Sequence, residues 1–301
     1  MKTPARFIYS PGYYCDIGAH VFPTVKFRLI YEKLRTWPEL GDEHFLEPRP
    51  ITRDDLLLVH TPEYVADLLS YSHTRRTLTS ELPISKQIID SYLIGTGGTL
   101  LACRCALDGH PAMNLTGGFH HAFPDHAEGF CYVNDIAIAI RKLQGEGRIR
   151  RAAVLDCDLH QGNGNAYVFR NDETVFTFSI HQENNYPVKQ QSDLDIGLDD
   201  GAGDDEYLRQ LRQHVPAILS EHKPDLVLYL AGADPFEDDQ LGALRLTKHG
   251  LRLRDELILG ESHRRGIPLA AVVAGGYAYN TDDTVDIHIN TCRVLMEVRP
   301  W

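Results

Sequence analysis

The sequence lacks any hydrophobic run approaching the roughly 20 residues that a membrane-spanning helix needs. Its first residues, MKTPARFIYSPGYY, also lack the apolar stretch of a secretory signal peptide. The six cysteines are scattered and include no Cys-x-x-Cys pair, which is typical of reduced thiols in a reducing compartment. We therefore expect a cytoplasmic protein with no membrane span.

The sequence is also poor in positive charge. It has 30 Lys and Arg against 42 Asp and Glu, for a formal net charge of −12. A nucleic-acid partner would call for a basic patch, so this charge argues against nucleic acid. The acidity is weakly compatible with cationic ligands. Hydrophobic residues make up 43% of the chain and aromatic residues 9%, as in a globular protein with a sizeable core.

No Pro/Ser-rich linker, internal repeat or low-complexity tract divides the chain. Segments with the pattern of strands alternate with segments of helical pattern to the end of the sequence. This alternation predicts a single domain, residues 1–301, of the α/β class: a doubly wound, mainly parallel sheet flanked by helices. The expected strands are 6–10, 112–116, 152–158, 174–180, 225–230 and 268–274, and the expected helices include 26–35, 61–71, 84–107, 132–143, 165–169, 204–221 and 247–265.

Three glycines interrupt one of these helical patterns. Gly95, Gly97 and Gly98 lie in the middle of segment 84–107. Each glycine weakens a helix by about 1 kcal/mol, so they indicate either a break or close packing against another backbone. The polar segments 75–82 and 181–204 are expected to be loops.

The most informative stretch is RAAVLDCDLHQGNG, residues 151–164. A short apolar run typical of a buried parallel strand leads into Asp156, Asp158 and His160, which stand at every second position. If the strand continues to His160, these side chains share one face. Unpaired burial would cost several kcal/mol for each group, so a metal ion is the simplest compensation. Taken alone, Asp-x-Asp and Asp-x-His also occur as turn formers and helix caps, and the segment leaves both readings open.

Four polar clusters follow four predicted strands. Each has an ordinary explanation by itself: a surface histidine pair, a helix cap or a tight turn. However, parallel strands deliver their carboxyl ends to the same edge of a sheet, where open α/β sheets bind ligands. Four coincidences on one edge are much less probable than one site, so the pattern favours convergence of segments 118–121, 156–160, 232–234 and 275–277.

The residue types suggest a catalytic metal. Asp158, His160 and Asp234 offer three ligands and leave a coordination position open for water. A divalent ion lowers the pKa of such a water from about 15.7 toward about 7. A His-Asp-Asp set accepts either Zn²⁺ or Fe²⁺.

Other residues of the clusters can move protons and stabilise charge. His120 and His121 are the candidate general base and acid, and Asp156 and Asn163 are candidates to orient their rings. Tyr277 follows two glycines and could donate its hydroxyl to an oxyanion. These parts together predict an amide or ester hydrolase.

The motifs GGFHHAFPDHAEGFCYVND, LDCDLHQGNG, AGAD and AGGY, in this order, resemble those of the zinc-dependent histone deacetylases, which have the arginase-like deacetylase fold. The resemblance covers nearly the whole chain. Its details are most similar to class IV and its bacterial relatives. These details are HVFPTVK at 20–26, TGGT at 96–99, Gln161, DDEYL at 204–208 and RDEL at 254–257.

The resemblance implies a role for each matched position. It makes Asp158, His160 and Asp234 the zinc ligands, His121 the general base and acid, and His120 an electrostatic partner oriented by Asp156. Tyr277 would polarise the scissile carbonyl. The tunnel for the acylated lysine would be lined by Gly129, Phe130 and Tyr186. A structural K⁺ ion is implied at Asp156, Asp158, His160, Ser179 and Ile180.

Two positions depart from the family pattern. Asn163 stands where class I enzymes have an aspartate behind the second histidine, so His121 is expected to be less basic than with a carboxylate partner. Ala274 replaces a glycine before Tyr277, which is expected to change the freedom of that loop.

The arginase branch of the fold uses Asp-x-His-x-Asp to help hold two manganese ions. This chain reads Asp158-Leu159-His160-Gln161-Gly162, so the last carboxylate is absent. One metal ion therefore fits better than two.

Three hypotheses follow. The first is a metal-dependent deacylase acting on N-acyl-lysine in proteins or peptides. The second keeps the machinery but takes a small acylated amine, such as an acetylpolyamine, which an acidic tunnel mouth would favour. The third is a non-catalytic module that only binds acyl-lysine. The presence of every catalytic position argues against it: His120, His121, Asp158, His160, Asp234 and Tyr277.

Overall fold

The computed structural model describes residues 4–297, and its centre is an eight-stranded sheet in the order β2-β1-β3-β8-β7-β4-β5-β6. Every pairing of neighbouring strands is parallel, so the predicted mainly parallel sheet is confirmed. The strands are β1 (Arg6–Ile8), β2 (Phe45–Leu46), β3 (Ala112–Asn114), β4 (Ala152–Asp156), β5 (Val175–Gln182), β6 (Leu194–Leu198), β7 (Leu226–Leu230) and β8 (Leu269–Val272).

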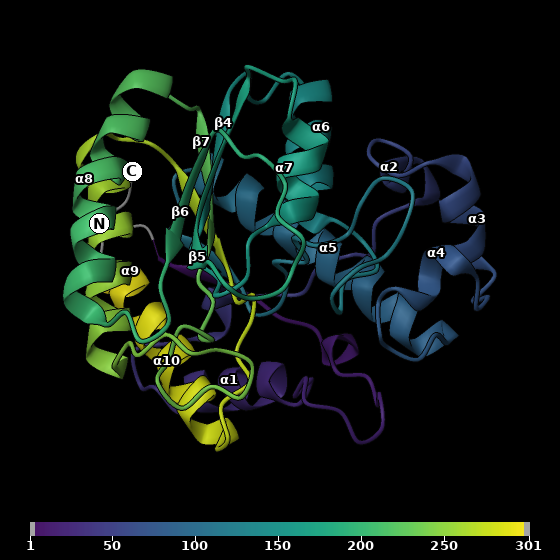
Figure 1. Ribbon diagram of the computed structural model, residues 1–301, viewed down its shortest axis with the longest axis horizontal. Coiled ribbons are helices and arrows are strands. Elements are labelled where there is room, and N and C mark those ends of the chain that lie inside the picture. The colour runs from purple at the N-terminus through teal and green to yellow at the C-terminus, as the bar shows by residue number, and fades with distance from the viewer. Residues whose placement is uncertain (1–3, 298–301) are drawn as a thin grey trace.

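Helices cover both faces of the sheet (Figure 1). On one side lie α8 and α9, with α10 and α1 packed beside them; on the other lie α5, α6 and α7, and the short α2, α3 and α4 extend beyond α5. This is the doubly wound arrangement. The helices are α1 (Lys26–Leu34), α2 (Arg53–Leu56), α3 (Pro62–Leu69), α4 (Arg75–Leu78), α5 (Lys86–Leu107), α6 (Asp135–Gly145), α7 (Asn163–Phe169), α8 (Asp204–His222), α9 (Lys248–Arg264) and α10 (Thr281–Glu297), with 3₁₀ turns at Pro11–Tyr13 and Asp42–His44.

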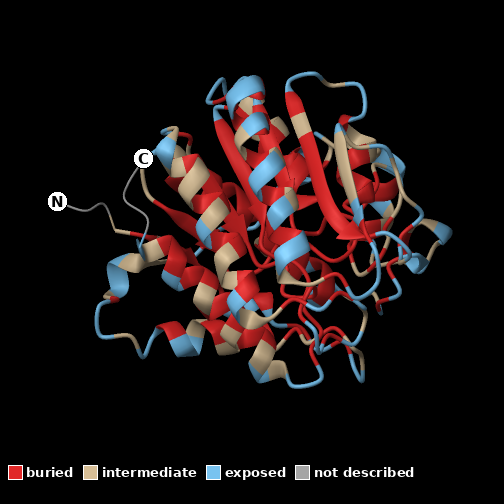
Figure 2. Cartoon of the chain, turned by 60° about the vertical axis from the view of Figure 1, so that its left-hand side comes forward, coloured by how far each residue is buried: buried red, intermediate tan, exposed pale blue. Residues whose placement is uncertain are grey.

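The central strands are buried on both faces, as Figure 2 shows. Every residue of β4, β7 and β8 is buried. This explains their continuous apolar sequences, because a parallel strand covered by helices on both sides has no solvent face. Polar side chains are therefore left for the ends of these strands.

Two loop predictions were wrong. Segment 75–82 contains α4, and the side chains of Thr77 and Ser80 are buried within it. Segment 181–204 contains the end of β5 and all of β6, an edge strand that pairs with β5 from Phe178↔Leu194 to Gln182↔Leu198. An edge strand is only half covered, so the sequence of β6 lacks the apolar run that marked the central strands.

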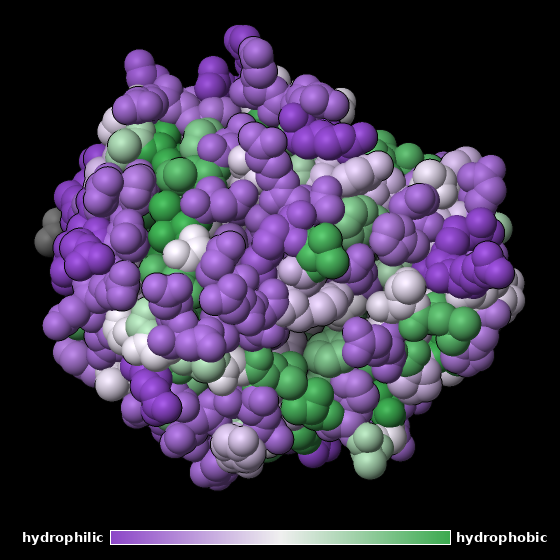
Figure 3. All heavy atoms as spheres, viewed as in Figure 1, coloured by the Kyte–Doolittle hydropathy of each residue, from purple (hydrophilic) through white to green (hydrophobic). Residues whose placement is uncertain are grey.

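None of the helices in residues 4–297 is long and apolar enough to cross a membrane. The molecular face in Figure 3 is mostly hydrophilic, with hydrophobic residues in patches between charged and polar ones.

The glycines of α5 serve close packing rather than a break, because the helix is continuous from Lys86 to Leu107. A Cβ atom on Gly97 would overlap the backbone carbonyl of Arg49, and one on Gly98 would overlap the Tyr13 hydroxyl. Backbone cannot move aside as a flexible side chain can. Of the two sequence-based alternatives, close approach is therefore correct.

We expect Gly97→Ala to destabilise the fold by about 3 kcal/mol, because overpacking against backbone is poorly relieved. The matched control is Gly145→Ala at the end of α6, where an added Cβ meets nothing within 4 Å. That change should be neutral or stabilising by up to about 1 kcal/mol. Denaturant unfolding measures both, and equal stabilities would contradict the packing argument.

Candidate active site

The four polar clusters follow four strands that are neighbours in the sheet, in the order β3-β8-β7-β4. Segment 118–121 comes after β3, 275–277 after β8 and 232–234 after β7, and 156–160 begins at the last residue of β4. Because all four strands run parallel, their carboxyl ends open onto one edge. The predicted convergence is confirmed by this topology.

The strand expected over 152–158 ends earlier, at Asp156, so the condition that it continues to His160 is not met. Beyond it the chain turns: the Asp158 amide donates to Asp156 Oδ1 (3.1 Å), and the His160 amide donates to Asp158 Oδ1 (3.0 Å). Each aspartate thus accepts from the backbone two residues later, which is the local preference of this side chain. The turn still directs Asp158 and His160 into the same site.

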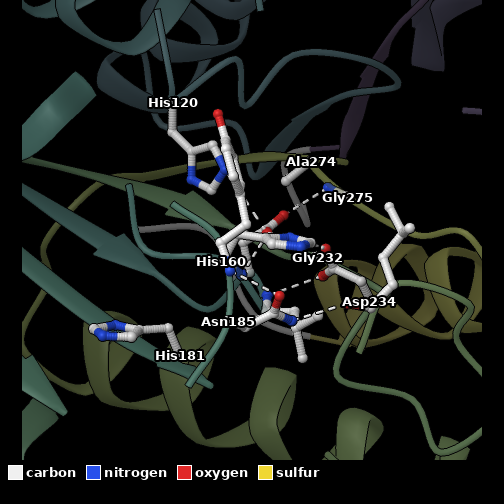
Figure 4. Close-up of polar contacts among 12 residues, drawn as sticks. His120, His160, His181, Asn185, Gly232, Asp234, Ala274 and Gly275 are labelled. Atoms are coloured by element: carbon white, nitrogen blue, oxygen red, sulfur yellow. Dashed lines mark hydrogen bonds and ion pairs between the residues drawn. The ribbon is translucent and has the colours of Figure 1, made fainter. Parts of the chain in front are cut away.

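Asp158, His160 and Asp234 form a buried group whose ligand atoms all lie within 4.8 Å of one another. His160 Nδ1 is 3.3 Å from Asp158 Oδ1 and 3.3 Å from Asp234 Oδ2. Figure 4 shows His160 and Asp234 side by side, with His120 above them and His181 apart.

The hydrogen bonding of these two carboxylates leaves room for a cation. Asp158 Oδ2 accepts from the Gly275 amide (2.7 Å) and Asp234 Oδ1 from the Leu159 amide (3.0 Å), whereas Asp234 Oδ2 has no hydrogen-bond donor among residues 4–297. Burial, together with the neighbouring Asp158 carboxylate, raises the pKa of Asp234 to about 7. Two carboxylates crowded in a dry site require positive charge, and one imidazole with two carboxylates is a donor set that holds a divalent metal. The residues therefore fit a metal ion.

His120 is joined to a carboxylate. Its Nδ1 lies 2.7 Å from Asp156 Oδ2, and its Nε2 lies 3.7 Å from Asp158 Oδ1. Burial lowers the pKa of His120, but the charges of Asp156 and Asp158 outweigh it and raise this pKa to about 9. His120 is accordingly protonated at neutral pH.

His121 has the opposite electrostatics. Burial and the neighbouring rings of His120 and His160 hold the pKa of His121 well below its usual range. Its Nδ1 lies 2.7 Å from Asn163 Oδ1, an acceptor, so Nδ1 carries the proton and Nε2 has a free lone pair. A neutral imidazole with a free Nε2 can act as a base at neutral pH.

Gly164 allows the close approach of α7 to the two histidines. A Cβ atom there would lie 2.6 Å from the carbonyl oxygens of both His120 and Ala122. The glycine after Asn163 thus lets the amide reach His121.

Tyr277 sits on a loop that is held from three sides. Its amide donates to Asp239 Oδ2 (2.7 Å), its carbonyl accepts from Gln240 Nε2 (2.7 Å), and Lys26 Nζ donates to the carbonyl of Ala274 (2.9 Å). Burial and nearby carboxylates raise the pKa of Tyr277 well above its usual value, so the hydroxyl keeps its proton. It remains a hydrogen-bond donor at all working pH values.

Ala274 adopts a left-handed conformation, with φ of +56°. A non-glycine residue in this region costs about 1 kcal/mol, so surrounding contacts must enforce it. They are the Lys26 bond to its carbonyl and the bond from its amide to the Gly117 carbonyl (3.1 Å). A side chain is tolerated in this conformation because these contacts fix the loop.

A cavity of about 230 Å³ leads to the histidines and Tyr277. The ring of Tyr186 lies 5.2 Å from that of His121, and Phe130 lies 5.9 Å from Tyr277, between ring centroids. Gly129 keeps the passage open, because a Cβ there would lie 2.7 Å from the Tyr186 hydroxyl. The predicted tunnel residues therefore line the cavity, and its wall is Glu81, His121, Gly129, Phe130, His160, Asn185, Tyr186, Leu241 and Tyr277.

Sequence reasoning missed several residues that support the site. Lys26 is buried beside Tyr277, with Nζ 5.5 Å from the ring centroid. Burial lowers the pKa of Lys26 to about 8, although Asp234 and Asp158 favour its charged form. Arg254, also fully buried, donates from Nη1 to the carbonyl of Gly232 (2.6 Å) and so holds the end of β7. A lysine on the buried face of α1 was a signal that could have been read.

Of the residues implied for a K⁺ ion, Ser179 is paired with Asp156 in the register of β4 and β5, and Ile180 follows it. Both are buried. The Ser179 hydroxyl is 2.9 Å from His181 Nδ1.

A parallel sheet with a buried Asp-His-Asp group, two histidines and a tyrosine at one edge has the parts of a metal-dependent hydrolase. The histone deacetylase domain family matches residues 20–292. The chain belongs to the histone deacetylase family, whose members are deacetylating hydrolases.

Known relatives span most of the chain. It is 43% identical to an uncharacterized protein of Picosynechococcus, covering 97% of this chain and 98% of that protein. It is 30% identical to histone deacetylase 2 of Arabidopsis thaliana, covering 91% and 75%. A crystal structure of a histone deacetylase homologue from Aquifex aeolicus has a TM-score of 0.80 at 24% identity, covering 97% and 84%, and supports the fold.

Proposed function

We propose that this protein is a metal-dependent deacylase that hydrolyses N-acyl-lysine amides of proteins or peptides. The observation that carries the proposal is the aromatic-walled cavity of about 230 Å³, lined both by exposed Tyr186 and by buried His121, His160 and Tyr277. A long unbranched side chain can reach the reacting groups through such a passage. We further propose that residues 1–301 form one catalytic domain, of the class IV type, that acts in the cytoplasm.

The residues of the chain divide the chemistry among them. His121 Nε2 accepts a proton from the attacking water and later donates it to the departing lysine amine. The Tyr277 hydroxyl donates a hydrogen bond to the oxyanion. His120, held protonated by Asp156, contributes positive charge beside it.

Zn²⁺ is the proposed metal, with Fe²⁺ as the alternative, because the His-Asp-Asp set suits both. Held by Asp158, His160 and Asp234, it would supply Lewis acidity that acidifies a water and polarises the carbonyl. A K⁺ ion at Asp156, Asp158, His160, Ser179 and Ile180 is proposed as structural, supported by the pairing of Asp156 with Ser179.

The test is hydrolysis of peptides bearing acetyl-, butyryl-, octanoyl- or myristoyl-lysine, with and without a chelator. We expect hydrolysis of at least one peptide, its loss after chelation, and its return on addition of Zn²⁺ or Fe²⁺. Asp234→Asn should lower the amount of metal retained, measured by elemental analysis. Hydrolysis that persists after complete metal removal would contradict the proposal, as would no hydrolysis of any peptide by metal-loaded protein.

A small acylated amine is the second candidate, and one observation favours it. The cavity wall includes Glu81, an exposed carboxylate that could attract a cationic substrate. Acetylspermidine and acetyl-lysine peptide should be compared on the unmodified protein and on Glu81→Gln. A polyamine enzyme would turn over acetylspermidine faster and lose that preference in the variant.

A further inference from the structure

Behind His121 lies a hydrogen-bonded chain that continues past Asn163. Asn163 Oδ1 faces His121 Nδ1 at 2.7 Å, and Asn163 Nδ2 donates to Glu128 Oε1, also at 2.7 Å. The Tyr186 hydroxyl donates to the same oxygen of Glu128 (3.1 Å). A carboxylate therefore stands one amide away from the ring nitrogen.

The direction of each bond in this chain is fixed. An ionised carboxylate can only accept, so Asn163 must present its NH₂ group to Glu128 and its oxygen to His121. The Gly164 amide, which can only donate, also binds Asn163 Oδ1 (3.0 Å) and enforces the same orientation. These hydrogen bonds thus place the proton of His121 on Nδ1 and leave Nε2 free.

Glu128 is kept charged where it stands. Its side chain is 22% exposed, and His126 Nε2 lies 3.5 Å from Oε2. Burial raises the pKa of Glu128, but the hydrogen bonds from His126, Asn163 and Tyr186 outweigh it and lower this pKa. The carboxylate is ionised at neutral pH.

We propose that Glu128 is a positioning residue for His121. Through Asn163, Glu128 supplies the negative charge that an aspartate behind the histidine would supply directly. The inference rests on the proposed hydrolase function. Each of the two histidines then has a carboxylate on the side of its Nδ1. Asp156 binds His120 directly, and Glu128 acts on His121 across one neutral amide. A charge polarises a neighbouring hydrogen bond most when the path is short and poorly solvated, as here.

Besides Asn163 and His126, Glu128 contacts Tyr186, and the effect of this contact must be separated from the effect through Asn163. Its bond to Tyr186 fixes a ring on the tunnel wall, so loss of the carboxylate could act on substrate binding instead. A change in wall geometry or in direct substrate contact would alter KM. A change in the basicity of His121 would alter kcat.

The decisive experiment places Glu128→Gln in two backgrounds, with Asn163 and with Asn163→Asp, on the metal-loaded protein. Glutamine keeps an acceptor for Asn163 and Tyr186, and the variant removes the charge together with the contact of Oε2 with His126 Nε2. With Asn163 we expect kcat to fall about tenfold with KM little changed. With Asp at 163 the charge already adjoins the ring and the two carboxylates repel, so Glu128→Gln should leave kcat unchanged or raise it.

Tyr186→Phe breaks the contact of Glu128 with the tunnel wall and leaves its bond to Asn163, so an effect of the wall on substrate binding appears there as a change in KM. If it reproduces the kcat loss of Glu128→Gln, or if that loss is equal in both backgrounds, the inference is overturned while the hydrolase function stands. No hydrolysis by the unmodified protein would instead overturn the function and the inference with it. Circular dichroism of each variant confirms that it is folded.

Discussion

Tyr277→Phe is expected to reduce kcat/KM on acyl-lysine peptides by about 10²- to 10³-fold, the usual cost of removing one oxyanion donor. The Tyr277 side chain is buried and lines the cavity, and the change removes its hydroxyl while keeping the ring. The ring can keep its packing against Phe130, 5.9 Å away between centroids, and its place 5.5 Å from Lys26 Nζ. The loss should therefore appear in turnover and leave stability nearly unchanged.

The matched control is Tyr279→Phe, two residues along the same loop. Tyr279 is 79% exposed, so the loss of its hydroxyl should not alter turnover. Thermal unfolding of both variants should match that of the unmodified protein. Near-normal turnover by Tyr277→Phe would show that its hydroxyl is not the oxyanion donor.

The site could be predicted from the sequence because its residues follow strand ends, and parallel topology collects strand ends on one edge. That argument needs only the alternation of strands and helices. It did not need the order of the strands, and the neighbours β3-β8-β7-β4 could not have been read from the chain. Asp158 and His160 face the same site, as expected, but a turn and not an extended strand places them there.

The residues that sequence reasoning missed act over long sequence separations through side-chain reach. Lys26 binds the carbonyl of Ala274, 248 positions away, and Glu128 binds Asn163, 35 positions away. No local pattern encodes such a contact, because it depends on how the start of a helix packs against a distant loop. The edge strand β6 was missed for a related reason, since its half-covered position requires no apolar run.

Asn163 was expected to make His121 less basic than a carboxylate partner would. The structure adds a carboxylate that the motif comparison did not consider, Glu128, on the far side of the same amide. The electrostatics of a catalytic histidine therefore depend on groups beyond its immediate partner. A substitution at 163 alone is an incomplete guide to the basicity of His121.

His121→Ala is expected to lower kcat by about 10³-fold near neutral pH, within the range lost with a general acid–base catalyst. His120 lies close by, with ring centroids 4.0 Å apart, yet it cannot take over as the base. Its pKa is raised to about 9, so at pH 7 only on the order of one molecule in a hundred has a free nitrogen there. The variant thus retains a histidine that is in the wrong protonation state.

The residual activity of His121→Ala should consequently rise with pH, as His120 loses its proton. Removing the His121 ring changes the surroundings of the protonated His120. The carboxylates of Asp156 and Asp158 nevertheless still hold the proton on His120. The measurement is kcat between pH 6 and pH 10, with His214→Ala on the outer helix α8 as the control. Turnover within tenfold of normal at pH 7 would show that His121 is not the base, and a control equally impaired would show that the loss is structural.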